Sequence, residues 1–202
     1  MYSKSCTVLA LLGVLGIAAC TVREVPYEDE IAAWRTDKDR FMRESSESPV
    51  VASERSAFPP LTYFPINQEY RVPASLNVSR VDDILEMSTS TGQKRRMQRI
   101  GTLEFTLKGQ PLKLTAFAEE NDAQLRRLFV PFRDLTNGSE TYPAGRYLDL
   151  ERTATGVYDL DFNRAYHPFC LFNSSYDCPY PPPESRLKVP IRAGERLPHK
   201  AR

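Results

Sequence analysis

Hydrophobic and polar residues alternate in short segments along most of the chain after residue 60. Between 102 and 107 every second residue is Leu or Phe, so these side chains would share one face of a β-strand. The segment 112–117 follows after the turn sequence Lys-Gly-Gln-Pro at 108–111. The two segments therefore predict an antiparallel hairpin.

Further short segments, rich in aliphatic and aromatic residues and bounded by turn residues, are predicted as strands. They are 84–90, 96–100, 125–132, 145–151, 157–162 and 187–191. Short strands at such regular spacing are typical of antiparallel sandwiches and barrels. The pattern predicts a mainly β fold in residues 61–196, an antiparallel β-sandwich or partly open barrel, followed by a frayed tail at 197–202.

The segment 27–44 has the pattern of an α-helix. Acidic residues fill its first turn and basic residues its last, which suits the helix dipole. Ile31, Trp34 and Phe41 fall on one face of this helix. We expect the helix to pack Trp34 against the β domain, and a partner-binding helix is the alternative. A polar, proline-containing connection completes the N-terminal part, residues 21–60.

Residues 1–20 resemble a lipoprotein signal peptide. Lys4 precedes an apolar run that is too short to span a bilayer, and the end of the run, Ile17-Ala18-Ala19-Cys20, resembles a lipobox. The resemblance implies cleavage before Cys20 and attachment of fatty acyl chains such as palmitate, which would anchor the protein to a membrane. Thr21 at the next position implies the outer membrane, facing the periplasm, in a Gram-negative host. An ordinary signal peptide is the alternative.

The charge balance argues against nucleic acid as a partner. Residues 1–20 hold one of the 27 Lys and Arg residues and none of the 26 Asp and Glu residues, so the rest of the chain is formally neutral. Nucleic-acid-binding domains usually carry a basic face. The chain also has no glycine-rich phosphate loop and no Gly-x-Ser-x-Gly elbow, and no motif in it indicates a cofactor.

Two cysteines, Cys170 and Cys178, remain once the leader and its lipidation site are set aside. An exported compartment permits disulfides, so the pair predicts a disulfide that closes a loop of nine residues. Zinc coordination by both cysteines, His167 and an acid, Asp161 or Asp177, is an alternative. A nucleophilic pair of Cys170 with His167 is another. The Cys-x7-Cys spacing fits no zinc motif known to us, and the disulfide would consume the thiol, so the disulfide is favoured.

Polar and charged residues are dense between 132 and 166 and shortly after. The candidate ligand-binding or catalytic residues are Asp134, Tyr142, Arg146, Asp161, Asn163, Tyr166, His167 and Glu184. One interpretation is a salt bridge between Arg146 and Asp161 on neighbouring strands. The alternative is a site where Arg146, Asn163 and Tyr166 bind an anionic ligand and Asp134 or Asp161 acts as a general base.

The same region carries a family resemblance. It contains, in order, D-x-T-x-G, T-Y-x-x-G-R-Y, D-F-N-x-A-Y, the cysteine pair, P-P-E and A-G-E. With these motifs, residues 48–195 resemble the bacterial domain-of-unknown-function family 1684, whose members are often lipoproteins. The chain has His167 where the family pattern usually has Asn, and Ser185 where Asn usually follows P-P-E. The resemblance therefore argues against an obligate histidine base or zinc ligand at position 167.

The sequence predicts an exported, lipid-anchored protein of the cell envelope whose β domain has a binding or structural role. Its expected partners are the membrane, through the lipid on Cys20, and a small anionic ligand or an envelope protein. An envelope hydrolase, or an enzyme that processes a small anionic ligand, using the polar cluster at 134–166 is the alternative, and a metal-binding module is a weaker one. The residue pattern leaves open whether any reaction is catalysed.

Overall fold

The computed structural model describes residues 25–80, 83–119 and 127–198. The predicted leader, with Cys20, and residues 199–202 lie outside this description. The helix and strands, in chain order, are α1 (Tyr27–Glu44), β1 (Arg71–Val78), β2 (Ile84–Ser88), β3 (Lys94–Leu107), β4 (Gln110–Glu119), β5 (Arg127–Phe132), β6 (Arg146–Glu151) and β7 (Val157–Asp161).

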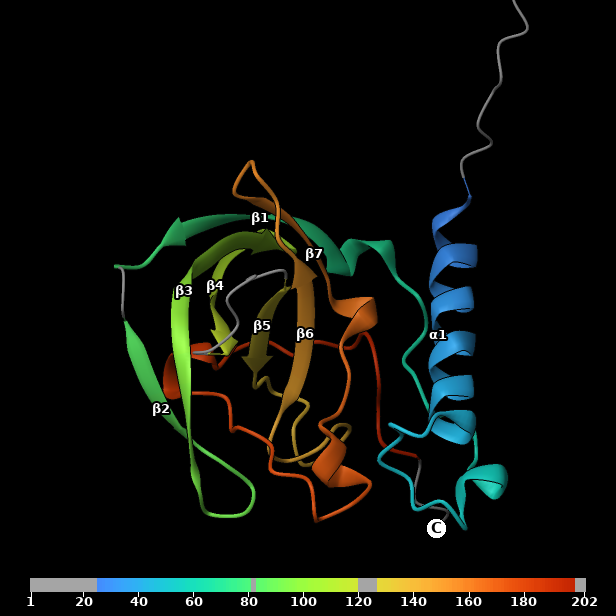
Figure 1. Cartoon of the computed structure of the whole chain (residues 1–202). Helices are drawn as coiled ribbons and strands as arrows, with labels where there is room; N and C mark the ends of the chain where they lie inside the picture. The colour runs from blue at the N-terminus through green and yellow to red at the C-terminus, as the bar shows by residue number, and fades with distance from the viewer. Residues whose placement is uncertain (1–24, 81–82, 120–126, 199–202) are drawn as a thin grey trace, which may run out of the picture.

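The strands form one antiparallel sheet that nearly closes into a barrel (Figure 1). Its order is β6-β5-β4-β3-β1-β7, and β2 pairs with one end of β3 beside this path. The edge strands β6 and β7 come into contact, which brings the two ends of the sheet together. The prediction of a mainly β fold, with a partly open antiparallel barrel and an N-terminal helix, is confirmed.

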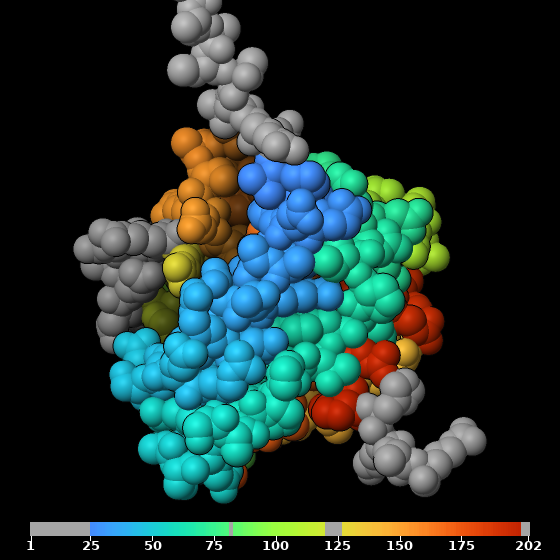
Figure 2. All heavy atoms as spheres, turned by 90° about the vertical axis from the view of Figure 1, so that its right-hand side faces the viewer, coloured from blue at the N-terminus to red at the C-terminus, as the bar shows by residue number. Residues whose placement is uncertain are grey.

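Helix α1 coincides with the predicted range and lies across one face of the molecule, beside the connection that follows it (Figure 2). Two residues of the helix, Ile31 and Met42, are buried. Trp34 packs edge-on against Tyr63, with 6.5 Å between the ring centroids. Trp34 therefore packs against the domain, as expected. In the described ranges, no helix combines the length and the apolar character that crossing a membrane would require.

Strand β1 was not predicted, because Pro73 and Asn77 are residues that strands usually avoid. The strand is stabilised by pairing on both sides, with β3 and with β7. The predicted strands 96–100 and 102–107 are a single strand, β3, with a bulge between Arg99 and Gly101. At Gly101 a Cβ atom would lie 2.4 Å from the carbonyl oxygen of Asn77, so only glycine fits there.

The strand predicted at 187–191 is wrong. The segment is irregular, although the Leu187 N–H donates to the carbonyl of Arg133 at 2.7 Å. Leu187 and Ile191 are both buried in the main core, and Pro190 between them has no N–H to donate to a strand ladder. The alternating hydrophobic residues of segment 187–191 are therefore explained by the burial of their side chains and not by pairing with a strand.

The main core lies on one face of the sheet. Pairs such as Leu103 with Leu114 and Leu128 with Leu150 stand opposite each other in register, so their side chains share that face. These residues are completely or almost completely buried. Arg146 pairs with Phe132, so this charged side chain also points into the core face.

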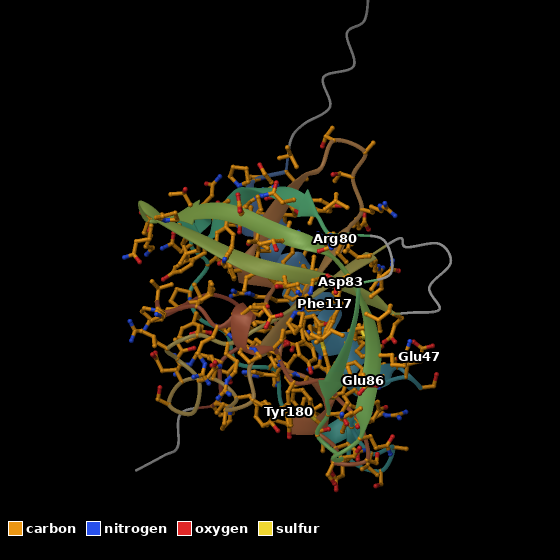
Figure 3. The ribbon with its side chains drawn as sticks, turned by 90° about the vertical axis from the view of Figure 1, so that its left-hand side faces the viewer. Glu47, Arg80, Asp83, Glu86, Phe117 and Tyr180 are labelled. Atoms are coloured by element: carbon orange, nitrogen blue, oxygen red, sulfur yellow. The ribbon has the colours of Figure 1, made fainter. Side chains whose placement is uncertain are left out.

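The opposite face of the sheet has its own small cluster, Met87, Met97 and Phe117, with Phe129 packed against it. Figure 3 looks at this side of the molecule, with Phe117 labelled near its middle and Tyr180 at its lower edge. The chain from 166 to 180, which we call the covering segment, is held here by hydrogen bonds to the β2–β3 turn region. The Ser90 N–H donates to the Cys178 carbonyl at 2.9 Å, and the Tyr180 N–H to the Ser88 carbonyl at 2.8 Å.

Candidate functional site

Asp134 and Arg146 form a fully buried ion pair beneath the main core. The Arg146 Nη2 donates to Asp134 Oδ2 at 2.9 Å and to the Ile191 carbonyl at 2.7 Å. Its Nη1 donates to the carbonyls of Ala193 and Glu195 at 2.5 and 3.1 Å. Burial lowers the pKa of Arg146, and the charge of Asp134 opposes that shift. The partner of Arg146 is therefore Asp134, and the predicted pairing with Asp161 is wrong.

The carboxylate of Asp134 is bonded through both oxygens and is closed to solvent. Besides Arg146, its Oδ1 accepts the N–H groups of Thr136 at 2.7 Å and Ile191 at 3.2 Å. Both side chains of the pair are shielded from solvent. Asp134 thus holds the 134–141 turn and the C-terminal chain together and is not placed to act as a general base.

Asp161 and Asn163 connect the barrel to α1. The Tyr27 hydroxyl, at the start of the helix, donates to Asp161 Oδ1 at 2.9 Å, and the Asn163 Nδ2 donates to that hydroxyl at 2.8 Å. Asn163 also binds both backbone groups of Asn67, through its Oδ1 at 3.0 Å and its Nδ2 at 2.9 Å. Burial, followed by the charge of Asp161, raises the pKa of Tyr27. These two predicted site residues therefore serve as structural ties.

His167 is buried and neutral. Its Nε2 accepts the Tyr142 N–H at 3.3 Å, and its Nδ1 lies 3.4 Å from the Glu195 carboxylate. Glu195 also accepts the His167 backbone N–H at 2.7 Å and pairs with Lys38 of α1 at 2.8 Å. Burial, with the positive charges of Arg146 and Lys38, lowers the pKa of His167 to about 3. The Glu195 charge favours protonation, but Lys38 already neutralises it, so burial dominates.

The Ala-Gly-Glu motif at 193–195 completes the hydrogen-bond network of His167, because its backbone approaches residue 165 closely. Gly194 has a φ of +76°, and a Cβ atom there would lie 2.4 Å from the Ala165 carbonyl oxygen. The close approach lets the Glu195 N–H donate to that carbonyl at 2.8 Å. Glycine at 194 is therefore required for the contact that brings Glu195 to His167.

The remaining predicted residues lie at the surface or in the covering segment. Glu184 forms an ion pair with Arg99 at 2.9 Å, and both are partly exposed. Tyr142 is hydrogen-bonded to Cys170, and burial, followed by the effect of Cys170, raises the Tyr142 pKa to about 12. Cys170 and Cys178 are free thiols, with the Cys170 N–H donating to Cys178 Sγ at 3.2 Å. The disulfide stays a prediction.

The predicted polar residues do not line one cavity. Tyr166 lines one pocket, Asp161 a second and Tyr142 a third. Asp134, Arg146 and Asn163 are buried in the hydrogen-bond networks above and line none of these three. These three pockets therefore do not show the convergent arrangement that the hydrolase hypothesis requires. The described residues hold no group of three or more His, Cys, Asp or Glu that is suited to a metal ion.

The pocket that contains Tyr166 is the candidate site, and we call it the aromatic pocket. It encloses about 410 Å³ between the second face of the sheet and the covering segment. Its lining consists of Arg95, Glu119, Phe129, Tyr147, Tyr166, Phe169, Ser175, Tyr176, Asp177, Cys178 and Pro179. The register places Phe129 opposite Phe117, so the floor of the pocket continues the small cluster on that face.

The rings of the aromatic pocket meet at steep angles. Phe129 and Tyr147 are 4.7 Å apart at 72°, and Tyr147 and Tyr166 are 5.8 Å apart at 87°. On the covering segment, Phe169 and Tyr176 are 5.4 Å apart at 88°. The backbones of Tyr147 and Tyr166 are joined by two hydrogen bonds of 2.9 and 3.0 Å, which fixes the corner between their rings.

The charged groups at the pocket already interact with each other. Arg95 lies 3.4 Å from the Glu119 carboxylate and 3.5 Å from that of Asp177, and it donates to the Asp177 carbonyl at 2.8 Å. Hydrogen bonds from Thr89 and Thr91 lower the pKa of Asp177, which keeps it ionised. The pocket therefore offers aromatic surface and a rim with two carboxylates and one guanidinium.

Sequence reasoning missed most of this pocket, because its two halves are distant in the chain. Phe129 and Tyr147 belong to predicted strands, but their side chains point away from the main core. The signal that could have found them is the presence of large aromatic residues on the alternate face of two strands. A second signal is the density of aromatic residues at 166–180, in the same segment as the two thiols and the histidine.

These features define a class: a mostly antiparallel β domain, with a helix tied to its side and an aromatic pocket beneath a covering segment. Residues 56–196 match the family described as "Protein of unknown function (DUF1684)", and the chain belongs to this family. It is similar to an uncharacterized protein of Haloarcula marismortui, whose structure was solved by solution NMR. The two are 38% identical with a TM-score of 0.67, over 85% of this chain and 94% of that one. No curated protein matches the sequence.

Proposed function

We propose that this chain is a lipid-anchored protein of the cell envelope that binds a small molecule in its aromatic pocket. The observation that carries the proposal is the pocket itself. Its volume of about 410 Å³ lies in the range of small-molecule sites, which are typically apolar with a few polar groups at the edge. Four of its rings, those of Phe129, Tyr166, Phe169 and Tyr176, stay partly accessible and can contact a ligand.

A binding role fits the pocket better than a catalytic one. The only thiol in the described lining belongs to Cys178, and burial raises its pKa to about 12, which disfavours the thiolate needed for attack. His167 is not part of the described lining, and its Nε2 already accepts a backbone N–H. The Ser175 hydroxyl, which is also in the lining, donates to the Asn173 side-chain oxygen at 2.8 Å and not to a base. None of these groups is arranged as an activated nucleophile, and a hydrolase is not proposed.

The lipid anchor is supported by the sequence of the leader. Residues 21–26 separate Cys20 from the start of α1, a span of at most about 25 Å when extended. The beginning of α1 lies at the top of Figure 1, and the covering segment lies in the lower half. An acylated Cys20 would thus hold the molecule by the end that is remote from the pocket, and leave the pocket facing solvent.

Ligand binding is tested by titrating the full chain, purified in a non-ionic detergent, with a set of small aromatic and aliphatic fragments. Binding is followed by NMR shifts of the pocket residues. The variant Tyr176→Ala should weaken the hits several-fold, because it removes one wall of the pocket. The matched control is Phe172→Ala, on the same segment, whose ring packs against Phe58 outside the lining. If no fragment shifts the pocket signals, the binding proposal is wrong.

The anchor is tested in a bacterial host by metabolic labelling with a palmitate analogue and by cell fractionation. The natural chain should carry the label and sediment with membranes, whereas Cys20→Ser should lose both properties. Cys6→Ser is the matched control, because Cys6 lies within the predicted leader and should be removed with it. An unlabelled, soluble natural chain would contradict the lipid anchor.

A further inference from the structure

We infer that the ligand of the aromatic pocket is an organic cation with a methylated ammonium group. This inference rests on the proposed binding function. Aromatic faces attract cations through the negative charge above the ring, and cages of several rings recognise quaternary ammonium groups. The aromatic pocket combines five rings with a rim on which carboxylates outnumber basic groups. Those two features point to the same ligand chemistry.

The ring geometry is that of a cage. Tyr147 and Tyr166 stand at 87° to one another and form one corner of the pocket. Phe169 and Tyr176 stand at 88° and form a second corner, on the covering segment. In an edge-to-face pair the partner ring covers one ring face, whereas a parallel stack covers two, so these pairs keep more ring faces free for contact. A roughly spherical cation can therefore contact several ring faces at once.

Tyr147, which is buried, and Tyr166, which is partly accessible, have electron-rich rings. The Tyr147 hydroxyl donates to the Pro179 carbonyl at 2.6 Å, and the Tyr166 hydroxyl donates to the Asp149 carboxylate at 2.7 Å. A phenol that donates its proton to an acceptor, above all to an anion, gains electron density in the ring. The donation thus strengthens the attraction of both rings for a cation.

One ring of the pocket already binds a cation within the protein. The Lys38 ammonium of α1 lies 4.1 Å from the centroid of the Tyr166 ring. The same ring lines the aromatic pocket. The contact shows that the Tyr166 ring attracts a positive charge in this fold, with Lys38 occupying one of its two faces.

The charges at the rim favour a cation over an anion. The single guanidinium in the described lining, that of Arg95, is close to the carboxylates of both Glu119 and Asp177. An anionic ligand would have to displace one of these contacts and approach the other carboxylate. A cationic ligand gains from both carboxylates and leaves Arg95 where it is.

A methylated ammonium suits the pocket better than a primary one. The walls are aromatic, and the Tyr147 and Tyr166 hydroxyls are already engaged. A primary ammonium would find hydrogen-bond acceptors in the Glu119 and Asp177 carboxylates, but against the aromatic walls its remaining N–H groups would lose their bonds to water, which is costly. A trimethylammonium group has no N–H donor to satisfy, so its apolar methyl groups can be buried against the rings.

The experiment compares three molecules of nearly the same shape: choline, the neutral 3,3-dimethylbutan-1-ol and the anionic 3,3-dimethylbutanoate. Each is titrated into the full chain in a non-ionic detergent, and binding is measured by calorimetry and by NMR shifts. We expect choline to bind about tenfold more tightly than the neutral analogue, and the anion to bind most weakly. Glycerophosphocholine in a further titration distinguishes a lipid headgroup from the free cation as the source.

Two variants test the assigned roles. Tyr176→Ala should weaken choline binding more than binding of the neutral analogue, whereas Phe172→Ala should change neither. Glu119→Gln should reduce the preference for choline several-fold and leave the affinity for the neutral analogue unchanged, because only a charge is lost.

The outcomes separate this inference from the proposed function. If the neutral or anionic analogue binds as tightly as choline, the cation inference is wrong and the binding function stands. If none of the three binds but other fragments shift the pocket signals, the cation inference is wrong and the binding function stands. If nothing binds in the pocket, both are wrong.

Discussion

At the scale of single residues, the polar side chains that look most catalytic in the sequence are the ones that hold the fold. Asp134, Arg146, Asn163 and His167 are all buried, and each binds backbone groups of distant segments. A buried polar group must be hydrogen-bonded, so such residues create fixed joints between chain segments. Acidic, basic and amide side chains are needed to connect chain segments in this way as much as they are needed for catalysis. Residue type alone therefore does not distinguish a catalytic residue from a structural one.

The buried ion pair gives the first prediction. Asp134→Asn would leave the Arg146 guanidinium buried without a counter-charge, and we expect a loss of about 3–5 kcal/mol in the free energy of unfolding. Glu184→Gln breaks the exposed pair with Arg99 and should cost about 0–1 kcal/mol. Urea unfolding followed by circular dichroism measures both. Equal costs for the two variants would show that the buried pair contributes no more than a surface pair.

His167 gives a prediction about pH. Its pKa is about 3 in the folded protein, against 6.5 for an ordinary histidine, so the unfolded chain binds the proton more readily between these values. Stability should therefore fall as the pH falls from 6.5 toward 3, with a slope of up to about 1.4 kcal/mol per pH unit. In His167→Asn this contribution disappears, because an amide side chain does not titrate in this pH range.

The measurement is the difference in urea midpoint between the natural chain and His167→Asn, taken at several pH values. Subtraction cancels the carboxylates that both proteins share. The stability of the natural chain relative to the variant should decrease by up to about 2–3 kcal/mol between about pH 6.5 and about pH 4.5. Parallel pH profiles would mean that His167 can be protonated in the folded state.

At the scale of elements, the sequence predicts strands where alternation and turn residues agree, and fails where tertiary pairing decides. The hairpin of β3 and β4 and the helix α1 have clear local signals, and both are found. β1 contains Pro73 and is a strand because β3 and β7 flank it. The segment 187–191 has the apolar spacing of a strand, but no neighbouring strand pairs with it in the described sheet.

The covering segment gives the prediction at this scale. Its residues 170–178 are bounded by two cysteines that are in contact, since the backbone N–H of Cys170 donates to Cys178 Sγ at 3.2 Å. A disulfide closing a loop of nine residues should stabilise the fold by about 2–3 kcal/mol. The melting temperature of the oxidised protein should exceed that of the reduced protein by roughly 5–10 °C.

The control is Cys178→Ser, which should melt at one temperature with or without reductant. Thiol titration under denaturing conditions establishes which form is present. If the natural chain melts at the same temperature in both forms, or if its thiols stay reduced under oxidising conditions, the disulfide prediction is wrong.

At the scale of the whole molecule, the pocket depends on parts that are far apart in the chain. Phe129 and Tyr147 come from the sheet, Tyr166 and Tyr176 from the covering segment, and Lys38 of α1 touches the outer face of this arrangement. Alternation predicts that a strand has two faces, but not which segment covers the second one. The fold class could therefore be predicted from local patterns, whereas the site required the three-dimensional arrangement.

The unit that folds should therefore include α1, although the family match begins at residue 56. The similar Haloarcula protein aligns over 85% of this chain, a larger share than residues 56–196 represent. Helix α1 supplies the Tyr27 hydroxyl to Asp161, the Lys38 ammonium to Glu195 and the buried side chain of Ile31. Without the helix, two carboxylates inside the domain each lose one of their partners.

The last prediction compares two truncated chains. Removal of residues 1–47 takes away α1 and should lower the free energy of unfolding by at least about 3 kcal/mol, because partners of buried charges are lost together with apolar contacts. Removal of residues 1–24 alone keeps every described contact of the helix and should unfold in one cooperative transition. Urea unfolding and the dispersion of amide NMR signals measure the difference. Equal stability of the two chains would mean that α1 is a separate appendage, and that the barrel supports the aromatic pocket without it.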